Sequence, residues 1–497
     1  PHFGCNCNCK CSVVSEAKTE TDSSADTDKD TDTATPAVKV GFQYKIIAAR
    51  CDQCTCTTSD KVNNSNSTGS GNYAPSYSPN GQYILYGCRE RPQFESDKGK
   101  LKLFHIESGL TEELTAGIDL GCDGVEWDYE TQTKETGDIN ENTNTNTKST
   151  LCFYVNAQYH GSYRVFRFTA MCSHDTAGTS ECRFQANVTD ITVMQGDNGV
   201  VGPKLVKSSS NTNNTSNTSN KSYLYFLESS LLSPPELKMA TMDTTKKDDK
   251  LFKPFYSTNS NTEGCVSCVT DSQSSVVLPC GDDDTKTSCV VPITTNESRY
   301  IHTVHVTCPK FTNNDIAMPT HAEKHYFRGG NNEWVQAWYL PPVSGNTTNT
   351  ELVDGTIPLA VIIHGGPQGA ILNQWHYRWN MAIFAALGYG VIAINFHGST
   401  GFGQDFTDSI SGDWSGKPYQ DIIIGTKYIL NHHKYLNPNR VGALGASYGG
   451  YMINWLNGHN PEGLFKVFVN HDGVFNNVAM YFSTEELWFS GKFVVDK

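Results

Sequence analysis

Ser447 stands in a pattern whose residue types and spacing are those of a serine nucleophile. The serine lies midway between Gly445 and Gly449, after a run of small apolar residues at 441–446 and before a helical pattern at 448–456. These features predict a sharp turn from a buried strand into a helix, which exposes the serine hydroxyl at a helix N-terminus where an oxyanion is stabilised. Glycines two residues to either side let the backbone make that turn without steric clash. The alternative is a tight turn that serves only packing.

A second glycine-rich sequence, His364-Gly365-Gly366, follows an apolar run at 359–363. Glycines directly after a buried strand allow a backbone N–H to point at the carbonyl oxygen that becomes charged during acyl transfer. We expect the N–H groups of Gly366 and Tyr448 to form an oxyanion hole, with His364 and Gly365 supporting the loop. The alternative is a glycine turn that caps a strand. Neither role calls for a metal ion or an organic cofactor, so none is expected at this site.

The chemistry also needs a general base and an acid that orients the base. In hydrolases with this kind of turn, both follow the serine along the chain. The candidates after Ser447 are His471 as base and Asp472 as acid, but neighbours on one strand end point to opposite faces and cannot act together on one serine. We therefore expect the Asp and the His to lie beyond residue 497, and the chain to be a fragment incomplete at both ends. The 497-residue chain is then expected to be inactive on its own.

Alternating strand and helix patterns surround these motifs. The expected strands are residues 333–340, 359–363, 391–395, 441–446 and 466–470, and the expected helices are residues 379–387, 419–431 and 448–456. This alternation predicts an α/β-hydrolase domain over residues 311–497, with a doubly wound, mostly parallel sheet that is truncated at its C-terminal side.

Residues 38–310 repeat short strand patterns joined by turn signals such as Tyr77-Ser78-Pro79-Asn80-Gly81. About three groups of strands can be recognised, which predicts an incomplete β-propeller, since closed propellers have about four to eight blades. Further blades are expected upstream of residue 1. The Asn/Ser/Thr tract at 208–222 is expected to be a surface loop. The alternative architecture is a β-sandwich.

Residues 1–37 combine a C-x-C-x-C-x-C array at 5–11 with a run of Glu, Asp, Ser and Thr. Such a composition cannot bury a core, so this segment is predicted to be disordered. The four cysteines could bind a soft metal ion together with the cysteines at 51, 54 and 56. Disulfide bonds or a disordered tail explain the array equally well.

The overall composition excludes some classes of function. With 38 basic and 52 acidic residues, the net charge is −14, which argues against nucleic acid as a partner. No apolar run reaches the roughly 18 residues of a membrane span, so a soluble protein is expected. The 17 cysteines lie between Cys5 and Cys308, and several N-x-S/T sequons are present, which together predict a secreted or extracellular glycoprotein.

Four segments together resemble the catalytic domain of the prolyl oligopeptidase family of serine peptidases. They are HGGP at 364–367, NFHGSTGFG at 395–403, GDWSGKPY at 412–419 and GASYGGYM at 445–452. Two further segments, NHDGVF at 470–475 and STEELWF at 483–489, are similar to the fungal secreted dipeptidyl peptidases of type V within this family. The resemblance implies a β-propeller that caps an α/β-hydrolase, a buried site between them, short peptides as substrates and release of N-terminal dipeptides.

One position departs from the family pattern, because His397 stands where the family usually has arginine. A single histidine beside a glycine-rich loop is interpreted as a structural substitution, not as the base. Two other functions are compatible with the sequence. One is a catalytically inactive protein that binds a partner through the loops of its N-terminal sheets. The other is an esterase that uses the same serine.

Overall fold

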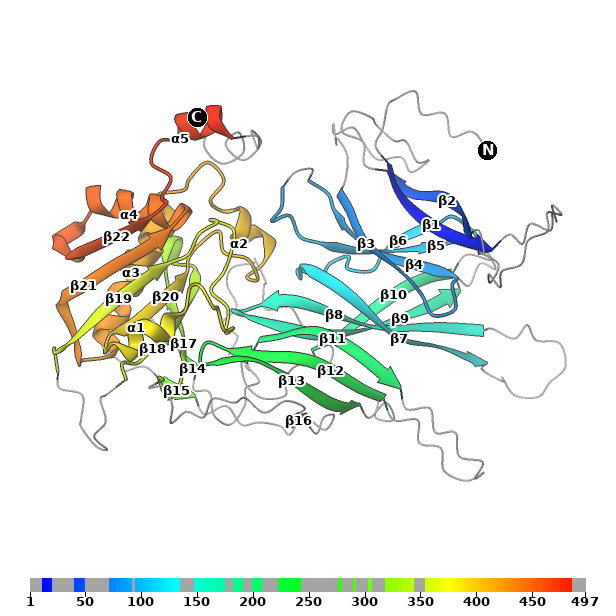
Figure 1. Ribbon diagram of the computed structural model, residues 1–497, viewed down its shortest axis with the longest axis horizontal. Coiled ribbons are helices and arrows are strands. Elements are labelled where there is room, and N and C mark those ends of the chain that lie inside the picture. Colours follow the sequence, from blue (N-terminus) through cyan, green and yellow to red (C-terminus); the bar gives the residue numbers. More distant parts are fainter. Residues whose placement is uncertain are drawn as a thin grey trace, which may run out of the picture.

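The structure is a computed structural model that describes residues 11–19, 40–49, 71–91, 94–134, 147–174, 182–190, 199–207, 222–242, 276–278, 289–291, 303–305, 318–343 and 354–484. Figure 1 shows two parts side by side. Small antiparallel sheets, coloured blue to green, come from the N-terminal half of the chain. An α/β unit, coloured yellow to red, comes from the C-terminal part.

Three four-stranded antiparallel sheets make up most of the N-terminal part. The first contains β3 (Gly71–Tyr77), β4 (Tyr83–Arg89), β5 (Lys100–His105) and β6 (Thr111–Glu113). The second contains β7 (Cys122–Lys134), β8 (Thr147–Tyr159), β9 (Ser162–His174) and β10 (Cys182–Asp190). The third contains β11 (Gly199–Lys207), β12 (Ser222–Ser230), β13 (Ser233–Met242) and β16 (Thr303–His305).

The first two sheets share an apolar core. Leu85 of β4 and Leu101 of β5 pack in one cluster with Phe153 of β8 and Phe166 of β9, and all four side chains are buried. Residues 151–155 of β8 are all buried, so both faces of this strand are covered. The turn 77–81 is formed as predicted, between β3 and β4, with Gly81 at a positive φ of 72°.

The number of sheets agrees with the three groups of strands recognised in the sequence, but the described sheets are open, and a propeller is not confirmed. In the third sheet, the sequence analysis missed β11. The tract at 208–222 lies outside the described residues, apart from Ser222, which begins β12.

The structure describes one part of the segment at 1–37, for which disorder was predicted. Residues 11–19 form β1 (Cys11–Thr19), which pairs antiparallel with β2 (Val40–Ala49). β2 is rich in apolar and aromatic residues and provides backbone partners that the polar composition of β1 does not reveal. Of the cysteine array at 5–11, only Cys11 lies among the described residues, and the cysteines at 51–56 do not, so a metal site there remains a prediction.

An eight-stranded mixed sheet forms the centre of the α/β unit. Its order is β15-β14-β17-β18-β20-β19-β21-β22. The strands are β14 (Val276–Leu278), β15 (Cys289–Val291), β17 (Glu323–Arg328), β18 (Trp334–Leu340), β19 (Ile357–Ile363), β20 (Gly390–Asn395), β21 (Leu436–Ala446) and β22 (Val467–His471). The last four are parallel to one another, as predicted, whereas β18 runs antiparallel to both β17 and β20.

The positions of strands β14 and β15 do not agree with the predicted domain boundary at residue 310. They precede this boundary in the chain, yet β14 pairs with β17 at the edge of the eight-stranded sheet. Three-residue apolar runs do not indicate which sheet they join, because long-range pairing decides that.

The helices of the α/β unit cover both faces of the sheet (Figure 1). They are α1 (Met381–Ala386), α2 (Gln404–Asp408), α3 (Lys417–His432), α4 (Tyr448–Gly458) and α5 (Asn477–Ser483), with short 3₁₀ turns η1 (Gly330–Asn332) and η2 (Pro461–Gly463). In the part of the chain that the structure describes, no helix combines the length and the apolar character needed to cross a bilayer.

Alternation along β20 explains the two covered faces. Val391 and Ala393 pack in a cluster with α1, whereas Ile392 and Ile394 belong to the larger core beneath α3 and α4. Gly425 allows α3 to lie close to the sheet, because a Cβ at this position would be 2.5 Å from the ring of Phe327. This is the doubly wound arrangement predicted from the alternating strand and helix patterns.

Candidate active site

Ser447 lies at the junction of β21 and α4 and is exposed. Its φ and ψ of 57° and −119° fall in a region that non-glycine residues rarely adopt. Two backbone hydrogen bonds hold this conformation: the Ser447 N–H donates to the His471 carbonyl at 3.1 Å, and the Tyr451 N–H donates to the Ser447 carbonyl at 3.0 Å. The predicted strand, turn and helix are therefore all present around Ser447.

The glycines of the pattern are required by space. A Cβ at Gly445 would collide with the backbone of Gly449, and a Cβ at Gly449 would collide with the carbonyl oxygen of Ile363. The two positions thus let α4 begin directly against the ends of β19 and β21. In this structure, the spacing around Ser447 is a steric requirement of the turn.

The loop after β19 borders the serine. A Cβ at Gly365 would be 3.4 Å from the Cβ of Ser447, so the two backbones lie close together. Gly366 has a φ of 128°, which favours glycine, and its N–H has no hydrogen-bond partner among the described residues. Two hydrogen bonds hold the loop: His364 Nδ1–H donates to the Gly365 carbonyl at 2.8 Å, and the Thr400 N–H donates to the Gly369 carbonyl at 2.9 Å.

The ring of His364 holds this loop in place. It is buried and stacks on Phe396 with ring centroids 4.1 Å apart. Burial lowers the pKa of His364 to about 4, although its hydrogen bond to Gly365 opposes that shift. The imidazole is therefore neutral near pH 7 and supports the loop as an uncharged group.

Tyr448 combines a buried side chain with an accessible backbone donor. As the first residue of α4, it has an N–H without an acceptor inside the helix. Its hydroxyl donates to the Trp414 carbonyl, and its ring packs against Phe396 and Trp414. Burial raises the pKa of this hydroxyl well above its usual value, so the side chain stays protonated. The packed ring fixes the position of the N–H next to Ser447.

The structure does not bring an acid and a base to the serine. His471 Nδ1 lies 3.2 Å from Asp472 Oδ2, but both side chains are largely exposed, and only the backbone of His471 contacts Ser447. The ring of His471 lies against Trp379. Within the described part of the chain, no side chain hydrogen-bonds to the Ser447 hydroxyl.

His397 occupies a buried structural position. Its Nδ1 lies 2.7 Å from Asp421 Oδ2 and its Nε2 lies 2.9 Å from Glu333 Oε2. Burial by itself would lower the pKa of His397, but the hydrogen bonds and charges of Asp421 and Glu333 outweigh it and raise the pKa. His397 thus joins α3 to the loop before β18, in agreement with its interpretation as a structural substitution.

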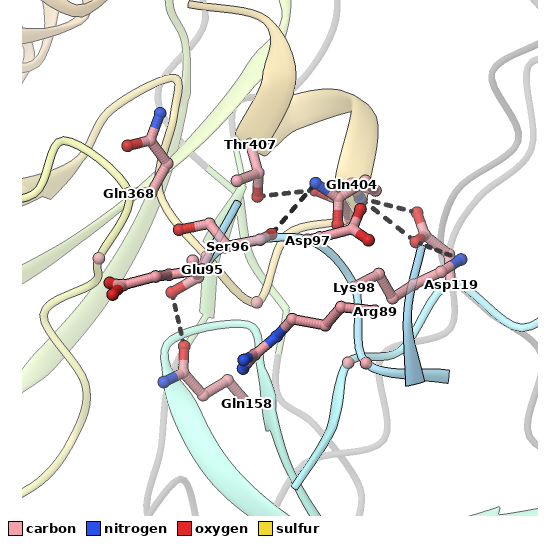
Figure 2. A pocket seen from close by; sticks show the side chains of 16 residues that line it. Arg89, Glu95, Ser96, Asp97, Lys98, Asp119, Gln158, Gln368, Gln404 and Thr407 are labelled. Carbon is pink, nitrogen blue, oxygen red and sulfur yellow. Dashed lines mark hydrogen bonds and ion pairs between the residues drawn. The ribbon is translucent and has the colours of Figure 1, made fainter. Parts of the chain in front are cut away.

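A polar cavity of about 500 Å³ lies between the N-terminal sheets and the α/β unit (Figure 2). Residues from both parts line it, among them Arg89, Glu95, Asp119, Gln158, Gln368 and Gln404. Contacts across its edge join the two parts: Arg91 Nη1 donates to Asp408 Oδ2 at 2.6 Å, and the Gln404 N–H donates to the carboxylate of Asp119 at 3.2 Å. Because Gln368 follows closely after Gly366, the cavity adjoins the loop beside the serine.

Some charged groups in the cavity have ion-pair partners, and others do not. Asp97 accepts hydrogen bonds from Arg91, and Asp119 forms an ion pair with Lys98. Glu95 is exposed in the cavity and has no ion-pair or hydrogen-bond partner within the described residues. Arg89 lies with its guanidinium over the ring of Tyr73, and its Nε is buried without a hydrogen bond in the described part of the chain.

The sequence analysis missed two groups of residues that the structure brings together. Glu95 and Arg89 come from separate segments of the first sheet and carry no motif. Glu323 and His325 alternate on β17 and meet His432 and His433 at the end of α3. The pattern His-x-Glu-x-His at 321–325 and the adjacent pair at 432–433 could have indicated this second group, since alternate residues share one face of a strand.

Comparison with known proteins shows the class of this domain. Residues 375–494 match the profile of the prolyl oligopeptidase family, and this part of the chain is a prolyl oligopeptidase family domain. The matched segment contains Ser447, the helices α3 and α4, and the parallel strands β21 and β22.

Curated relatives carry a more specific name. The chain is 48% identical over 178 residues to dipeptidyl-peptidase 5 of Schizosaccharomyces pombe, which covers 36% of this chain and 25% of the relative. It is 44% identical over 160 residues to probable dipeptidyl-peptidase 5 of Emericella nidulans, which covers 32% and 21% of the two chains. The match thus spans about a quarter of the length of these relatives.

Among solved structures, the chain is similar to the acylaminoacyl peptidase of Pyrococcus horikoshii, with 18% identity, a TM-score of 0.49, and 84% and 47% of the two chains covered. It is also similar to a puromycin-hydrolyzing peptidase of Mycobacterium tuberculosis, with 14% identity, a TM-score of 0.48, and 85% and 56% covered.

Proposed function

We propose that the protein is a serine peptidase that hydrolyses short peptides and releases N-terminal dipeptides. The observation that carries the proposal is the exposed Ser447 in a strained turn at the start of α4, close to Gly365 of the loop after β19. The family match of residues 375–494 and the names of the curated relatives support the reaction class.

The reaction follows from the roles of these groups. The Ser447 hydroxyl oxygen attacks the scissile carbonyl carbon, and its proton passes to a histidine. The N–H groups of Gly366 and Tyr448 stabilise the resulting oxyanion, and its collapse expels the amine, which takes the proton. Water then hydrolyses the acyl-enzyme. No described residue fills the role of the histidine.

A fluorophosphonate probe tests the proposal on the protein produced from its complete gene. We expect one covalent label per chain, located on Ser447 by peptide mass analysis, and none on the Ser447→Ala variant. Dipeptidyl-coumarin substrates should be hydrolysed in preference to short acyl esters. Labelling with the opposite substrate preference would favour an esterase, and absence of labelling would favour the inactive binding protein.

Gly366→Ala tests the oxyanion hole. A Cβ would lie 2.6 Å from the Gln368 nitrogen, and alanine is strained at a φ of 128°, so the loop and its N–H must shift. We expect kcat to fall by about 10²–10³-fold, the typical cost of losing one oxyanion donor, with a much smaller change in KM. Gly412→Ala is the matched control, because its φ is also positive but a Cβ there meets open space. Equal losses of kcat in both variants would contradict the assignment.

Glu95→Gln tests the release of N-terminal dipeptides. The free N-terminal ammonium group of a peptide substrate needs a carboxylate to bind it. Glu95 is the acid in the cavity without a partner within the described residues. We expect KM for dipeptidyl-coumarins to rise about 10- to 100-fold, the value of a hydrogen bond to a charged group, while N-acylated substrates are unaffected. Glu107→Gln, an exposed acid of the first sheet outside the cavity, is the control. A uniform loss on both substrate types would overturn this role.

Secretion belongs to the proposal as well. It is supported by the 17 cysteines and the N-x-S/T sequons. Digestion of the natural protein with an N-glycosidase should lower its mass, and an unchanged mass would argue against passage through the secretory pathway.

A further inference from the structure

Three histidines and one carboxylate meet at the edge of the eight-stranded sheet. Glu323 and His325 are two residues apart on β17, so their side chains share one face. His432 is the last residue of α3, and His433 is its C-cap. We call these four residues the Glu323 cluster.

The donor atoms of the Glu323 cluster converge. His325 Nε2 and His433 Nε2 lie 2.9 and 3.1 Å from the same oxygen, Glu323 Oε2. One donor atom each from Glu323, His432 and His433 lie within 4.8 Å of one another. His325 is fully buried, and the side chains of His433 and Glu323 are 13% and 19% exposed, so little water competes for these atoms.

Hydrogen bonds alone do not satisfy the cluster. His325 Nε2–H donates to Glu323, but His433 Nε2 is buried and has no aligned hydrogen bond in the described part of the chain. The ring nitrogens of His432 have no hydrogen-bond partner among the described residues either. His433 Nε2 is a buried polar atom without a hydrogen bond, which is costly, and a cation would satisfy it together with a ring nitrogen of His432.

We propose that the Glu323 cluster binds a divalent transition-metal ion of the Zn²⁺ type. Imidazole nitrogen and carboxylate oxygen are the ligands that Zn²⁺ takes in proteins, at about 2.0–2.2 Å. Tetrahedral ligands at that distance are about 3.3–3.5 Å apart. The pairs at 2.9 and 3.1 Å therefore need to separate by only a few tenths of an ångström, as the ion replaces the protons between them.

Aromatic residues hold the imidazoles in place. The Tyr428 hydroxyl lies 3.4 Å from His325 Nδ1 and can accept its proton when an ion takes the place of the proton on Nε2. The ring of Tyr339 stacks on His433 with centroids 4.4 Å apart, and the ring of Tyr428 stacks on His432 at 5.8 Å. Glu323, His432 and His433 supply three ligand atoms within 4.8 Å of one another, and His325 Nε2 lies beside them, 2.9 Å from Glu323 Oε2.

The position of the cluster indicates a structural role. His433 lies three residues before the first residue of β21, whereas Ser447 follows the end of β21, so the two lie at opposite ends of that strand. Glu323 belongs to β17, near the edge of the sheet. An ion bound there connects the C-terminus of α3 to β17 and stabilises the sheet without taking part in peptide hydrolysis.

Metal titration tests the site in untagged full-length protein that has been dialysed against a chelator. We expect one Zn²⁺ per chain by calorimetry, a higher Tm with Zn²⁺, and visible absorption bands typical of tetrahedral Co²⁺ when Co²⁺ is used instead. His432→Gln and His433→Gln should each weaken Zn²⁺ binding by about 100-fold or more, above the 10- to 100-fold cost of losing a supporting residue.

His459→Gln is the matched control, because His459 caps the end of α4 as His433 caps α3 but is exposed and outside the cluster. It should bind Zn²⁺ as the unmodified protein does. All variants should keep their far-ultraviolet circular dichroism and be labelled at Ser447. Zn²⁺ binding that the His432 and His433 variants retain, or no binding by the unmodified protein, would overturn the proposal.

Discussion

Ser447→Ala is expected to reduce kcat for dipeptidyl-coumarin substrates by about 10⁶-fold, the loss observed when a serine protease loses its nucleophile. Ser447 is exposed in its turn, whereas the hydroxyl of the neighbouring Tyr448 is buried and donates to the Trp414 carbonyl. Alanine keeps the Cβ and the same backbone conformation, so the fold and the N–H groups remain. The residual rate should be that of the oxyanion hole and substrate binding alone.

Steady-state kinetics on the protein produced from its complete gene measures this loss, and KM should change little because the hydroxyl acts in the transition state. Ser411→Ala is the control, since Ser411 is an exposed serine of the same unit, outside the turn. Its kcat should be unchanged. A Ser447→Ala enzyme that keeps most of its activity would place the nucleophile elsewhere and remove the basis of the proposed mechanism.

The sequence predicted the α/β unit well because its signals are local. β19 and β20 are apolar runs, as expected for parallel strands covered on both faces, whereas β22 is apolar but lies at the end of the described sheet and is largely exposed. The turn at Ser447 was also predictable, since each glycine beside it is required by a backbone contact within the same motif. Steric contacts within a motif and the burial of a strand depend on the residue types of that segment, so both can be predicted from the local sequence.

Long-range pairing was less predictable. The polar strand β1 gains its backbone partners from β2, and β14 pairs with β17 across an interval of more than forty residues. Such pairing partners, and not the strand's own composition, decide which sheet a short strand joins. The Glu323 cluster escaped notice for the same reason, because β17 and the end of α3 meet only in the folded chain. Glu95 has no motif and is distinguished only by its lack of a partner in the cavity.

His397→Ala is expected to destabilise the protein by about 3–5 kcal/mol near pH 6, the usual cost of breaking a buried ion pair by removing one partner. Asp421 is fully buried, and the ring and N–H of His397 both contact its Oδ2. Without the imidazolium, the carboxylate keeps only the N–H groups of Gly330 and residue 397. Chemical denaturation monitored by circular dichroism measures the change, and His459→Ala serves as a control at an exposed position.

The pH dependence of stability separates the charge of His397 from its packing. Its folded-state pKa is raised above the unfolded value of about 6.5, because Asp421 and Glu333 outweigh the opposing effect of burial. The stabilisation is therefore fully present below about pH 6.5 and is lost as the pH rises through the raised folded-state pKa. His397→Arg, which restores the residue usual in the family, keeps its charge over this range. The unmodified protein should lose stability relative to His397→Arg as the pH rises above neutrality, and parallel stability curves for the two proteins would show that the imidazole in this ion pair is neutral.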